Sequence, residues 1–537
     1  MNPKIDYYTN DDVLSLLKND NFLKKWDELY SACAWSTVFQ SKEFIANWYR
    51  IFYHIYQPIF LKCEYENELI GLIALAILRK KKGSKVFIIA AGHGESDCQP
   101  WLAAPQWNDH FITLSVEIVL RNFPNEDILI RNIPPHIAGC LSKYRSASYH
   151  CVVQRHRRPI ITLEKFLFSK RDRKRLNRLK RIGHHEEIKD EKIFLFYIDQ
   201  LTALYDFRQG AMFNRTPYYH IPYYKEFLIS LFRSNLIKVL IFKTGHQIIA
   251  SLIVTLDKDV AHTGAINVHS PLYASYSPGY LQFLLMSELL ANQGLKYFDL
   301  TPGDDYYKDR LTTYYDHVIT LTITSRKAFK IRRELRKYYH YSLNKMGIRP
   351  LAFNLQIEKK IHPLWEKGPY TYLTQLLKEK LANSKRVIEI PQISCVEAQD
   401  LHLEKNNIRA LLAYKNHAFN RTRWQFLQAS MIHFEQGKQV ITYTHKGQLK
   451  IAVWYKKYTG GYTHKNKIKL LEGSVVLEDL ICHTNYKHKL HVFIFKAIEM
   501  LKNEFPSENF YLISEFNLKL QALPLPLTNG KSENIYW

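Results

Sequence analysis

The sequence predicts a mixed fold of the α+β or α/β class, in which mostly antiparallel mixed sheets are flanked by helices. The first observation behind this prediction is an order of β-hairpin, third strand, helix and further strand that occurs three times along the chain. The second is length, because 537 residues exceed what one hydrophobic core ordinarily supports. The third is composition, since 46% apolar and 14% aromatic residues are typical of a globular protein.

Apolar periodicity and turn residues define the three copies. In the first copy the expected strands are 59–65, 69–78, 86–91 and 128–133, with a helix at 110–122. In the second they are 238–243, 248–256, 261–267 and 296–300, with a helix that starts at Pro278. In the third they are 439–444, 449–458, 474–482 and 510–514, with a helix at 489–503. Gly245 and Gly447 supply the positive φ that short hairpin turns require.

The expected boundaries between the copies lie near 155–159 and 347–368, where Pro, Gly and basic residues interrupt the apolar pattern. We therefore expect a first lobe (1–158), a second lobe (159–325), a basic helical linker (326–367) and a C-terminal third lobe (368–537). The second lobe has the clearest pattern and is the main candidate for a functional site.

Residues 277–310 of the second lobe combine several signals. Ser277 suits a helix N-cap, Pro278 suits the first helical position, and leucines follow at helical spacing until Gly294 supplies a C-cap. A buried strand is expected at 296–300, with a polar loop past its end. The backbone N–H groups of such a helix N-terminus can hold a phosphorylated cofactor.

This segment resembles the FemAB-like acyltransferases of the GNAT superfamily, especially the CelD-type group linked to bacterial polysaccharide synthesis. The residues that match are Pro278, Gly279, Phe298, Asp299, Gly303, Asp304, Tyr307, Lys308 and Arg310. Upstream, segments 38–41 with Trp48, 96–98 with Pro100, and 170–181 fall where that family has similar elements. The resemblance covers roughly the first 320 residues and implies tandem GNAT-like lobes there. The third GNAT-like lobe is expected from the repeated pattern alone.

The resemblance implies an N-acetyltransferase-like enzyme that uses acetyl-CoA or another acyl-CoA as its donor. In the GNAT pattern a backbone N–H of the third strand polarises the thioester carbonyl, here near Ile266 and Asn267. The donor diphosphate is then expected over Ser277, Gly279 and Tyr280. The usual Gln/Arg-x-x-Gly-x-Gly/Ala loop is replaced by the sequence YSPG, which leaves the donor open.

Three residues are the catalytic candidates. In the resembled family a Lys at the position of Lys308 lies at the active site and stabilises negative charge on the carbonyl or on a donor phosphate. The counterpart of Asp97 also lies at the site and can take up a proton from the acceptor. Asp305 is expected to pair with Arg310 or to orient Lys308. The alternatives are a turn-capping Asp97, a solvated Lys308 and a helix-capping Asp305.

The acceptor is expected near Arg208, Arg215, Tyr218 and Tyr307. A sugar or peptide could stack on the tyrosine rings while Arg215 meets a phosphate or carboxylate. The alternative for the tyrosine cluster is packing in a lid. No metal site is expected, because the adjacent side chains of the HHEE run at 184–187 do not face one point and no Cys-x-x-Cys pair occurs.

Charge points to an anionic partner. Of a formal net charge of +25, much lies in segment 170–181, with eight basic residues, and in segment 326–349, with nine. Both are expected to be helices, whose inner edges are Leu176 and Leu179 in one and Phe329, Leu335 and Tyr339 in the other. Such surfaces attract CoA, a nucleotide-linked sugar, tRNA or an acidic membrane leaflet. A basic exterior that only keeps the protein soluble is the alternative.

Three classes of function therefore compete. The first is an acyltransferase that acts on a sugar, amino sugar or peptide. The second is an aminoacyl-tRNA-dependent, FemAB-like peptidyltransferase, and the third is a non-catalytic basic module that binds nucleic acid, membrane or protein. A cytoplasmic location is expected, because no apolar run approaches the ~20 residues needed to span a bilayer and the N-terminus lacks a signal pattern. The seven scattered cysteines are expected to be reduced.

Overall fold

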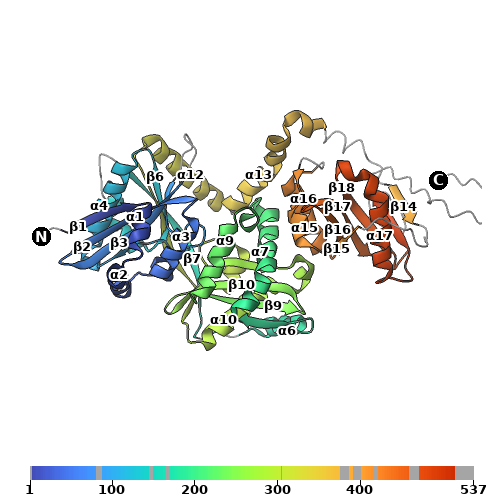
Figure 1. Ribbon diagram of the computed structural model, residues 1–537, viewed down its shortest axis with the longest axis horizontal. Helices are drawn as coiled ribbons and strands as arrows, with labels where there is room; N and C mark the ends of the chain where they lie inside the picture. The colour runs from blue at the N-terminus through green and yellow to red at the C-terminus, as the bar shows by residue number, and fades with distance from the viewer. Residues whose placement is uncertain are drawn as a thin grey trace, which may run out of the picture. The chain divides into compact units, whose positions relative to one another are not determined.

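The computed structural model describes residues 3–79, 87–143, 149–164, 166, 168–303, 305–374, 386–390, 401–416, 421–458 and 471–514. The chain forms two compact units, residues Met1–Gln209 with Arg215–Glu358, and residues Gly210–Asn214 with Lys359–Trp537. Each unit contains a mixed sheet flanked by helices, so the predicted fold class is confirmed (Figure 1). The limits of the individual lobes stay predictions.

The first unit contains one large sheet. Its strands are β1 (Lys4–Thr9), β2 (Tyr56–Tyr65), β3 (Glu68–Leu78), β4 (Phe87–Ala90), β5 (Leu102–Ala103), β6 (Asp127–Ile133), β7 (His150–Thr162), β8 (His184–Ile188), β9 (Ile237–Thr244), β10 (Gln247–Leu256), β11 (Val260–His269), β12 (Tyr297–Asp299) and β13 (Tyr314–Thr324). Their spatial order is β1-β2-β3-β4-β6-β13-β7-β12-β11-β10-β9-β8, and β5 pairs with β3.

Helices flank this sheet. They are α1 (Asp11–Leu16), α2 (Asp20–Ala32), α3 (Lys42–Phe52), α4 (Asn108–Asn122), α5 (Gly139–Lys143), α6 (Lys170–Lys180), α7 (Glu191–Phe213), α8 (Pro217–His220), α9 (Pro222–Arg233), α10 (Pro278–Asn292), α11 (Tyr306–Leu311) and α12 (Lys327–Lys345). A further helix, α13 (Pro350–Lys367), has residues in both units. Short 3-10 turns are η1 (Val38–Gln40), η2 (Pro105–Trp107), η3 (Pro135–Ala138) and η4 (Pro271–Tyr276). Among the described residues, no helix combines the length and apolarity needed to cross a bilayer.

The first two predicted copies of the repeat are present, and they exchange strands. In the first, β4 runs parallel to β6, and β6 is antiparallel to β13, which follows the second copy in the chain. In the second, β11 runs parallel to β12, and β12 is antiparallel to β7, which follows the first copy. β7 and β13 pair with each other along their length and so join both halves into one sheet. The segment at 155–159, which we expected to interrupt the pattern, lies inside β7.

The second unit repeats the same order. Its strands are β14 (Arg386–Ile390), β15 (Leu403–Lys405), β16 (Gln439–His445), β17 (Gln448–Lys457), β18 (Val475–Cys482) and β19 (Phe510–Ser514), in the spatial order β14-β19-β18-β17-β16-β15. Its helices include α15 (Ile408–Leu412), α16 (Arg423–Glu435) and α17 (Leu490–Lys502), preceded by the 3-10 turn η6 (Thr484–Lys489). The hairpin, the parallel β18–β19 pair and the helix between them confirm the third predicted copy.

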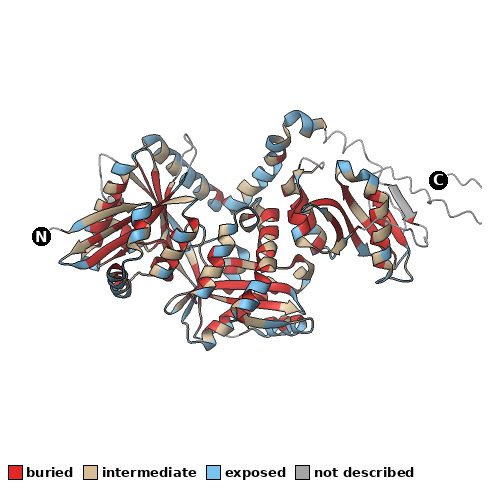
Figure 2. Ribbon diagram, in the orientation of Figure 1, coloured by how far each residue is buried: buried red, intermediate tan, exposed pale blue. Residues whose placement is uncertain are grey.

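Buried residues are concentrated in the inner strands of the large sheet, whereas the edge strands β1 and β8 are mostly not buried (Figure 2). β10 is buried over almost its whole length, as its continuous apolar run predicts. In the first half α4 packs Phe111 against Gly71, where a Cβ atom would lie 2.5 Å from the phenyl ring. In the second half α10 contributes Leu281 and Phe283 to the core. The six described cysteines are free thiols, as expected.

Candidate functional site

The parallel strands β11 and β12 diverge in the second lobe. They pair only where residues 260–262 face 297–299, after which β12 ends and β11 continues to His269. β11 is also irregular against β10, because Leu252 faces Asn267 while Val254 faces Thr263. Three residues of β11 therefore stand opposite one of β10, and such a bulge leaves backbone groups outside the ladder. Ile266 and Asn267, the predicted carbonyl-binding positions, lie in and beside this bulge.

The start of α10 differs from the prediction in one respect. Pro278 occupies the first helical position, and Gly294, with φ of +83°, follows the helix end as expected. Ser277 occupies the predicted N-cap position, but its side chain makes no capping hydrogen bond. The reason is that η4 ends at Ser277, whose φ of 54° and ψ of 44° turn the chain into the left-handed region between the two helices.

Cationic side chains flank this helix start. The Arg178 guanidinium of α6 lies 4.7 Å from the ring centre of Tyr276, and that of Arg310 lies 4.4 Å from the ring centre of Tyr280. Gly279 packs so closely on His269 that a Cβ atom would lie 2.8 Å from Nδ1. Arginines beside a helix N-terminus suit a diphosphate. The residues around Ser277 and Tyr280 therefore fit the anionic part of a donor, whereas the missing Cβ of Gly279 is needed for packing.

The loop that carries Asp97 is held by the first lobe. Asn132, with a left-handed backbone at the end of β6, donates from Nδ2 to the Asp97 carbonyl at 2.7 Å. Gln40 of η1 donates from Nε2 to the Cys98 carbonyl at 3.0 Å, and the Trp26 indole donates to the Gln40 carbonyl at 3.0 Å. The segment at 38–41 thus fixes the position of the loop through hydrogen bonds.

This loop presents two carboxyl groups with raised pKa values. Burial, reinforced by the charge of Asp299 and opposed by His262 and Lys308, raises the pKa of Asp97 to about 7. Burial and the neighbouring charge of Asp97 raise the pKa of Glu95 to about 8. A carboxyl group with a pKa near neutrality can act as a general base at the pH of a cell.

Lys308 projects from α11 into the same region. Its side chain is buried, and Nζ donates to the Thr301 carbonyl at 3.1 Å and lies 3.7 Å from Asp305 Oδ2. Burial lowers the pKa of Lys308, while Asp305, Asp97 and Asp299 oppose this shift. Asp305 occupies the N-cap position of α11 without a side-chain capping bond, so its carboxylate is available to Lys308. Asp304 lies outside the described residues.

A buried ion network lies beside these groups. Asp299 Oδ2 lies 3.1 Å from Nδ1 of His262 and 3.7 Å from the Arg158 guanidinium. Burial alone would lower the pKa of His262, yet hydrogen bonds and charge from Asp257 and Asp299 raise it to about 9. The pKa of Asp299 is lowered, because His262 and Arg158 outweigh the effect of burial. Phe39 packs on the His262 ring, with 5.2 Å between ring centres.

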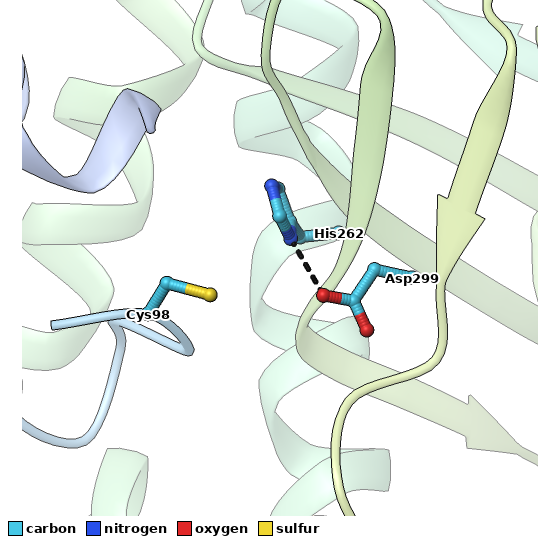
Figure 3. Close-up of side chains that lie close together, drawn as sticks. All are labelled: Cys98, His262 and Asp299. Atoms are coloured by element: carbon cyan, nitrogen blue, oxygen red, sulfur yellow. Dashed lines mark hydrogen bonds and ion pairs between the residues drawn. The ribbon is translucent and has the colours of Figure 1, made fainter. Parts of the chain in front are cut away.

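Cys98, His262 and Asp299 are the described residues that together could offer three ligands to a metal ion (Figure 3). One atom of each lies within 4.8 Å of the others. The Arg158 guanidinium, however, lies 3.9 Å from Cys98 Sγ and 3.7 Å from Asp299, where it supplies the positive charge. Burial also raises the pKa of the Cys98 thiol, which disfavours the thiolate that a metal requires. The ion network explains this cluster without a metal.

The predicted acceptor residues lie in two places. Arg208 donates from Nη1 to the Asn267 carbonyl at 3.2 Å, and Asn267 donates from Nδ2 to the Tyr307 hydroxyl at 3.4 Å, so both Arg208 and Tyr307 border the bulge. Tyr218 packs edge-on against Tyr205, with 5.4 Å between ring centres, and burial and then Glu95 raise its pKa. Arg215 is exposed. Burial, and then the charges of Arg333 and Arg215, lower the pKa of Arg131.

The sequence interpretation missed several residues of this site, namely Glu95, Arg158, Asp257, His262 and the acid role of Asp299. They come from five separate strands and loops, so no local spacing relates them. Asp299 matched the family pattern, and its place at the end of a buried strand was the one available signal.

Residues 168–309 match the model of the acetyltransferase (GNAT) domain. The matched residues include the diverging strands, the start of α10 and Lys308. This part of the chain is therefore similar to a GNAT domain. No curated protein matches the chain.

Solved structures resemble the chain only distantly. FemX is 9% identical with a TM-score of 0.41 and covers 56% of this chain and 95% of its own. The tandem GNAT protein of the clavulanic acid biosynthesis pathway is 9% identical with a TM-score of 0.38, and the match covers 60% of this chain and 99% of that protein. L-PGS from Bacillus licheniformis is 10% identical with a TM-score of 0.35, and the match covers 57% of this chain and 92% of that protein. The functional assignment rests on the domain match and on the residues of the site.

Proposed function

We propose that the protein is an acyltransferase that moves an acyl group from an acyl-CoA, or a similarly activated donor, to an amine or hydroxyl group of a sugar, amino sugar or peptide. Within the superfamily, the block from Pro278 to Arg310 favours the FemAB-like branch and its CelD-type group. The observation that carries the proposal is that the Asp97–Cys98 loop reaches the end of β12. Arg158 lies 3.9 Å from Cys98 Sγ and 3.7 Å from Asp299, and the charge of Asp97 opposes the lowering of the Lys308 pKa.

The proposed reaction needs no covalent enzyme intermediate. The acceptor nitrogen or oxygen attacks the thioester carbonyl, whose oxygen becomes negatively charged, and the carbon–sulfur bond then breaks to release the thiol. The Asp97 carboxylate takes the proton that the acceptor loses, because its pKa of about 7 lies near the working pH. Backbone N–H groups at the β11 bulge and the Lys308 ammonium stabilise the oxyanion.

The remaining site residues position these groups. Arg208 holds the backbone of β11 at Asn267, next to the bulge. Asp305 and the Thr301 carbonyl fix the Lys308 amine. The arginines near Tyr276 and Tyr280 bind the donor phosphates.

The test is release of free thiol from a panel of acyl-CoA donors, with amino sugars, sugars and peptides as acceptors, by wild-type protein and by Lys308→Ala. Acceptor-dependent thiol release that the variant lacks supports the proposal. Equal thiol release by wild type and variant contradicts the proposal. So does the lack of thiol release with every donor and acceptor pair, and if the protein still binds anionic ligands, that result favours the non-catalytic module.

One observation favours aminoacyl-tRNA as the donor instead. The YSPG sequence stands in place of the usual CoA-binding loop, and Ser277 directly before α10 has a left-handed backbone. The backbone of this loop is therefore not the one expected of a CoA-binding loop. The basic helix α6 beside it would suit an RNA backbone. Transfer of a labelled amino acid from charged tRNA that is abolished by ribonuclease, with no thiol release from acyl-CoA, would establish this alternative.

A further inference from the structure

The helix α12 presents an apolar face to solvent. Ile331, Leu335 and Tyr338 are spaced at i, i+4 and i+7, so they lie on one side of the helix. They are 60%, 64% and 67% exposed, although side chains of this size are usually buried. We expected Leu335 and Tyr339 to form the inner edge of this helix, and both are exposed, so that prediction is wrong.

The opposite side of α12 is attached to the sheet of the first unit. Phe329 packs on Phe87 of β4, with 6.0 Å between ring centres, and Leu343 is buried. Arg326, just before the helix, forms an ion pair with Asp127 at the start of β6. These contacts set the rotation of the helix, so the apolar face is directed outward by the fold and is not a consequence of fraying.

Cations flank the apolar face. Lys327 and Lys330 lie on one side of it, and Arg332 lies on the other. Glu334 is the single acidic residue of the helix, and it lies 3.9 Å from Lys337. An exposed apolar stripe between rows of basic residues is the pattern of a helix that lies in a membrane interface.

We propose that α12 is a docking surface for an anionic membrane, with Ile331, Leu335 and Tyr338 inserted among the acyl chains and the flanking lysines and arginines against lipid phosphates. The proposal does not depend on acyl transfer, because it concerns binding alone.

The basic helix α6 explains why a membrane fits better than RNA. α6 carries comparable charge, but its apolar residues Leu176 and Leu179 are 6% and 1% exposed and belong to the core. Charge alone suffices for a nucleic-acid backbone, so α6 is the helix that an RNA-binding function would predict. The exposed apolar stripe of α12 adds nothing to such contacts, whereas insertion into lipid uses it.

The test is flotation of the full chain with vesicles of phosphatidylcholine alone or mixed with phosphatidylglycerol, at physiological salt. Wild-type protein should float with the anionic vesicles and not with the neutral ones. The triple variant Ile331→Ser, Leu335→Ser, Tyr338→Ser should bind at least about tenfold more weakly, because the apolar contact is lost while the charge is kept. Hydrogen exchange should show that anionic vesicles protect residues 327–346.

The matched control is Ile193→Ser, Leu195→Ser, Phe196→Ser, which removes three exposed apolar side chains from α7 and should bind like wild type. Unchanged melting temperatures in both triple variants would show that folding is intact. Equal vesicle binding by wild type and the α12 variant overturns the proposal, as does failure of wild type to bind anionic vesicles. A third result also overturns it. In that case the wild-type protein does not bind vesicles, and the α12 substitutions abolish its RNA binding or its self-association.

Discussion

Single residues determine the chemistry available at the site. Lys308, Asp97, Asp299 and His262 are ionisable groups placed where the protein desolvates them, an arrangement that costs stability unless the charges compensate one another. The network from Asp257 through His262 and Asp299 to Arg158 provides that compensation. Among the residues that the structure describes, none forms an ion pair with Asp97, so burial raises its pKa, whereas His262 and Arg158 lower that of Asp299.

Lys308→Ala should retain the fold and lose most transfer activity. Loss of one preorganised cation at the developing oxyanion lowers kcat by roughly 10²–10³-fold. Steady-state rates and thermal melts check this expectation. Lys296→Ala is the control, because Lys296 is an exposed lysine of the same lobe that pairs with Asp259. Full activity in Lys308→Ala would remove this residue from the mechanism.

Asp97→Asn should flatten the pH dependence of the reaction. In the wild type kcat/KM should rise as pH increases through about 7, since only the carboxylate accepts a proton. The variant should lack this limb and react about 10²–10⁴-fold more slowly. An unchanged pH profile would assign the base to another group, with Glu95 the nearest candidate.

Stability provides an independent readout for Asp97. A carboxyl group with a raised pKa keeps its proton in the folded state at a pH where the unfolded chain has released it. The free energy of unfolding that Asp97 contributes is therefore largest at low pH and falls as pH rises from about 4 to about 7. Denaturant titrations at several pH values should show that Asp97→Asn lacks this decline.

At the scale of elements, the start of α10 depends on a close approach to β11. Gly279→Ala places a methyl group about 2.8 Å from the His269 ring, inside van der Waals contact. We expect a loss of about 1–3 kcal/mol of stability together with weaker donor binding, because overpacking displaces the helix start. Chemical denaturation and the donor KM measure the two effects. Gly139→Ala, where no atom lies within 4 Å, should be neutral in both.

The third lobe has a strand irregularity like that of β11, filled differently. β18 departs from register with β17 at Asp479, which has a left-handed backbone. Arg421 grips the Asp479 carboxylate with two hydrogen bonds of 2.7 Å, and His433 approaches it at 2.9 Å. These partners hold the pKa of Asp479 well below its usual range, although burial alone would raise it. The position that borders the proposed carbonyl site in the second lobe is therefore occupied by a structural ion cluster in the third.

At the scale of the whole molecule, the ion cluster at Asp479 predicts that the third lobe takes no part in acyl transfer. Asp479→Ala removes the partner of the Arg421 guanidinium, whose side chain is 39% exposed, and should destabilise the third lobe by about 1–3 kcal/mol. Transfer activity should persist below the temperature at which that lobe unfolds, since the proposed chemistry lies in the first unit. Calorimetry resolves the two units, and an activity assay follows the first. Loss of activity while the third lobe is still folded would show that this lobe takes part in the reaction.

The strand exchange explains how two lobes form one site. β7 and β13 pair over residues 150–160 and 314–324. β7 follows the first copy but pairs with β12 of the second, and β13 follows the second copy but pairs with β6 of the first. Neither strand was expected from the sequence, because β7 contains an arginine-rich stretch that looks like a break and its partner lies about 160 residues away. Long-range pairing outweighed local composition at this point.

Local sequence determined the three hairpins, the helices that follow their third strands, the basic helices, and the residues Asp97, Lys308 and Asp305 as candidates. Such features follow from periodicity, turn glycines and short motifs, whose partners are neighbours in the chain. The tertiary structure alone decided that His262, Asp299 and Arg158 surround these candidates, that Ser277 is left-handed, and that Leu335 faces solvent. Pairing between distant strands sets which side chains meet and which helix face is covered, and a linear pattern does not contain that information.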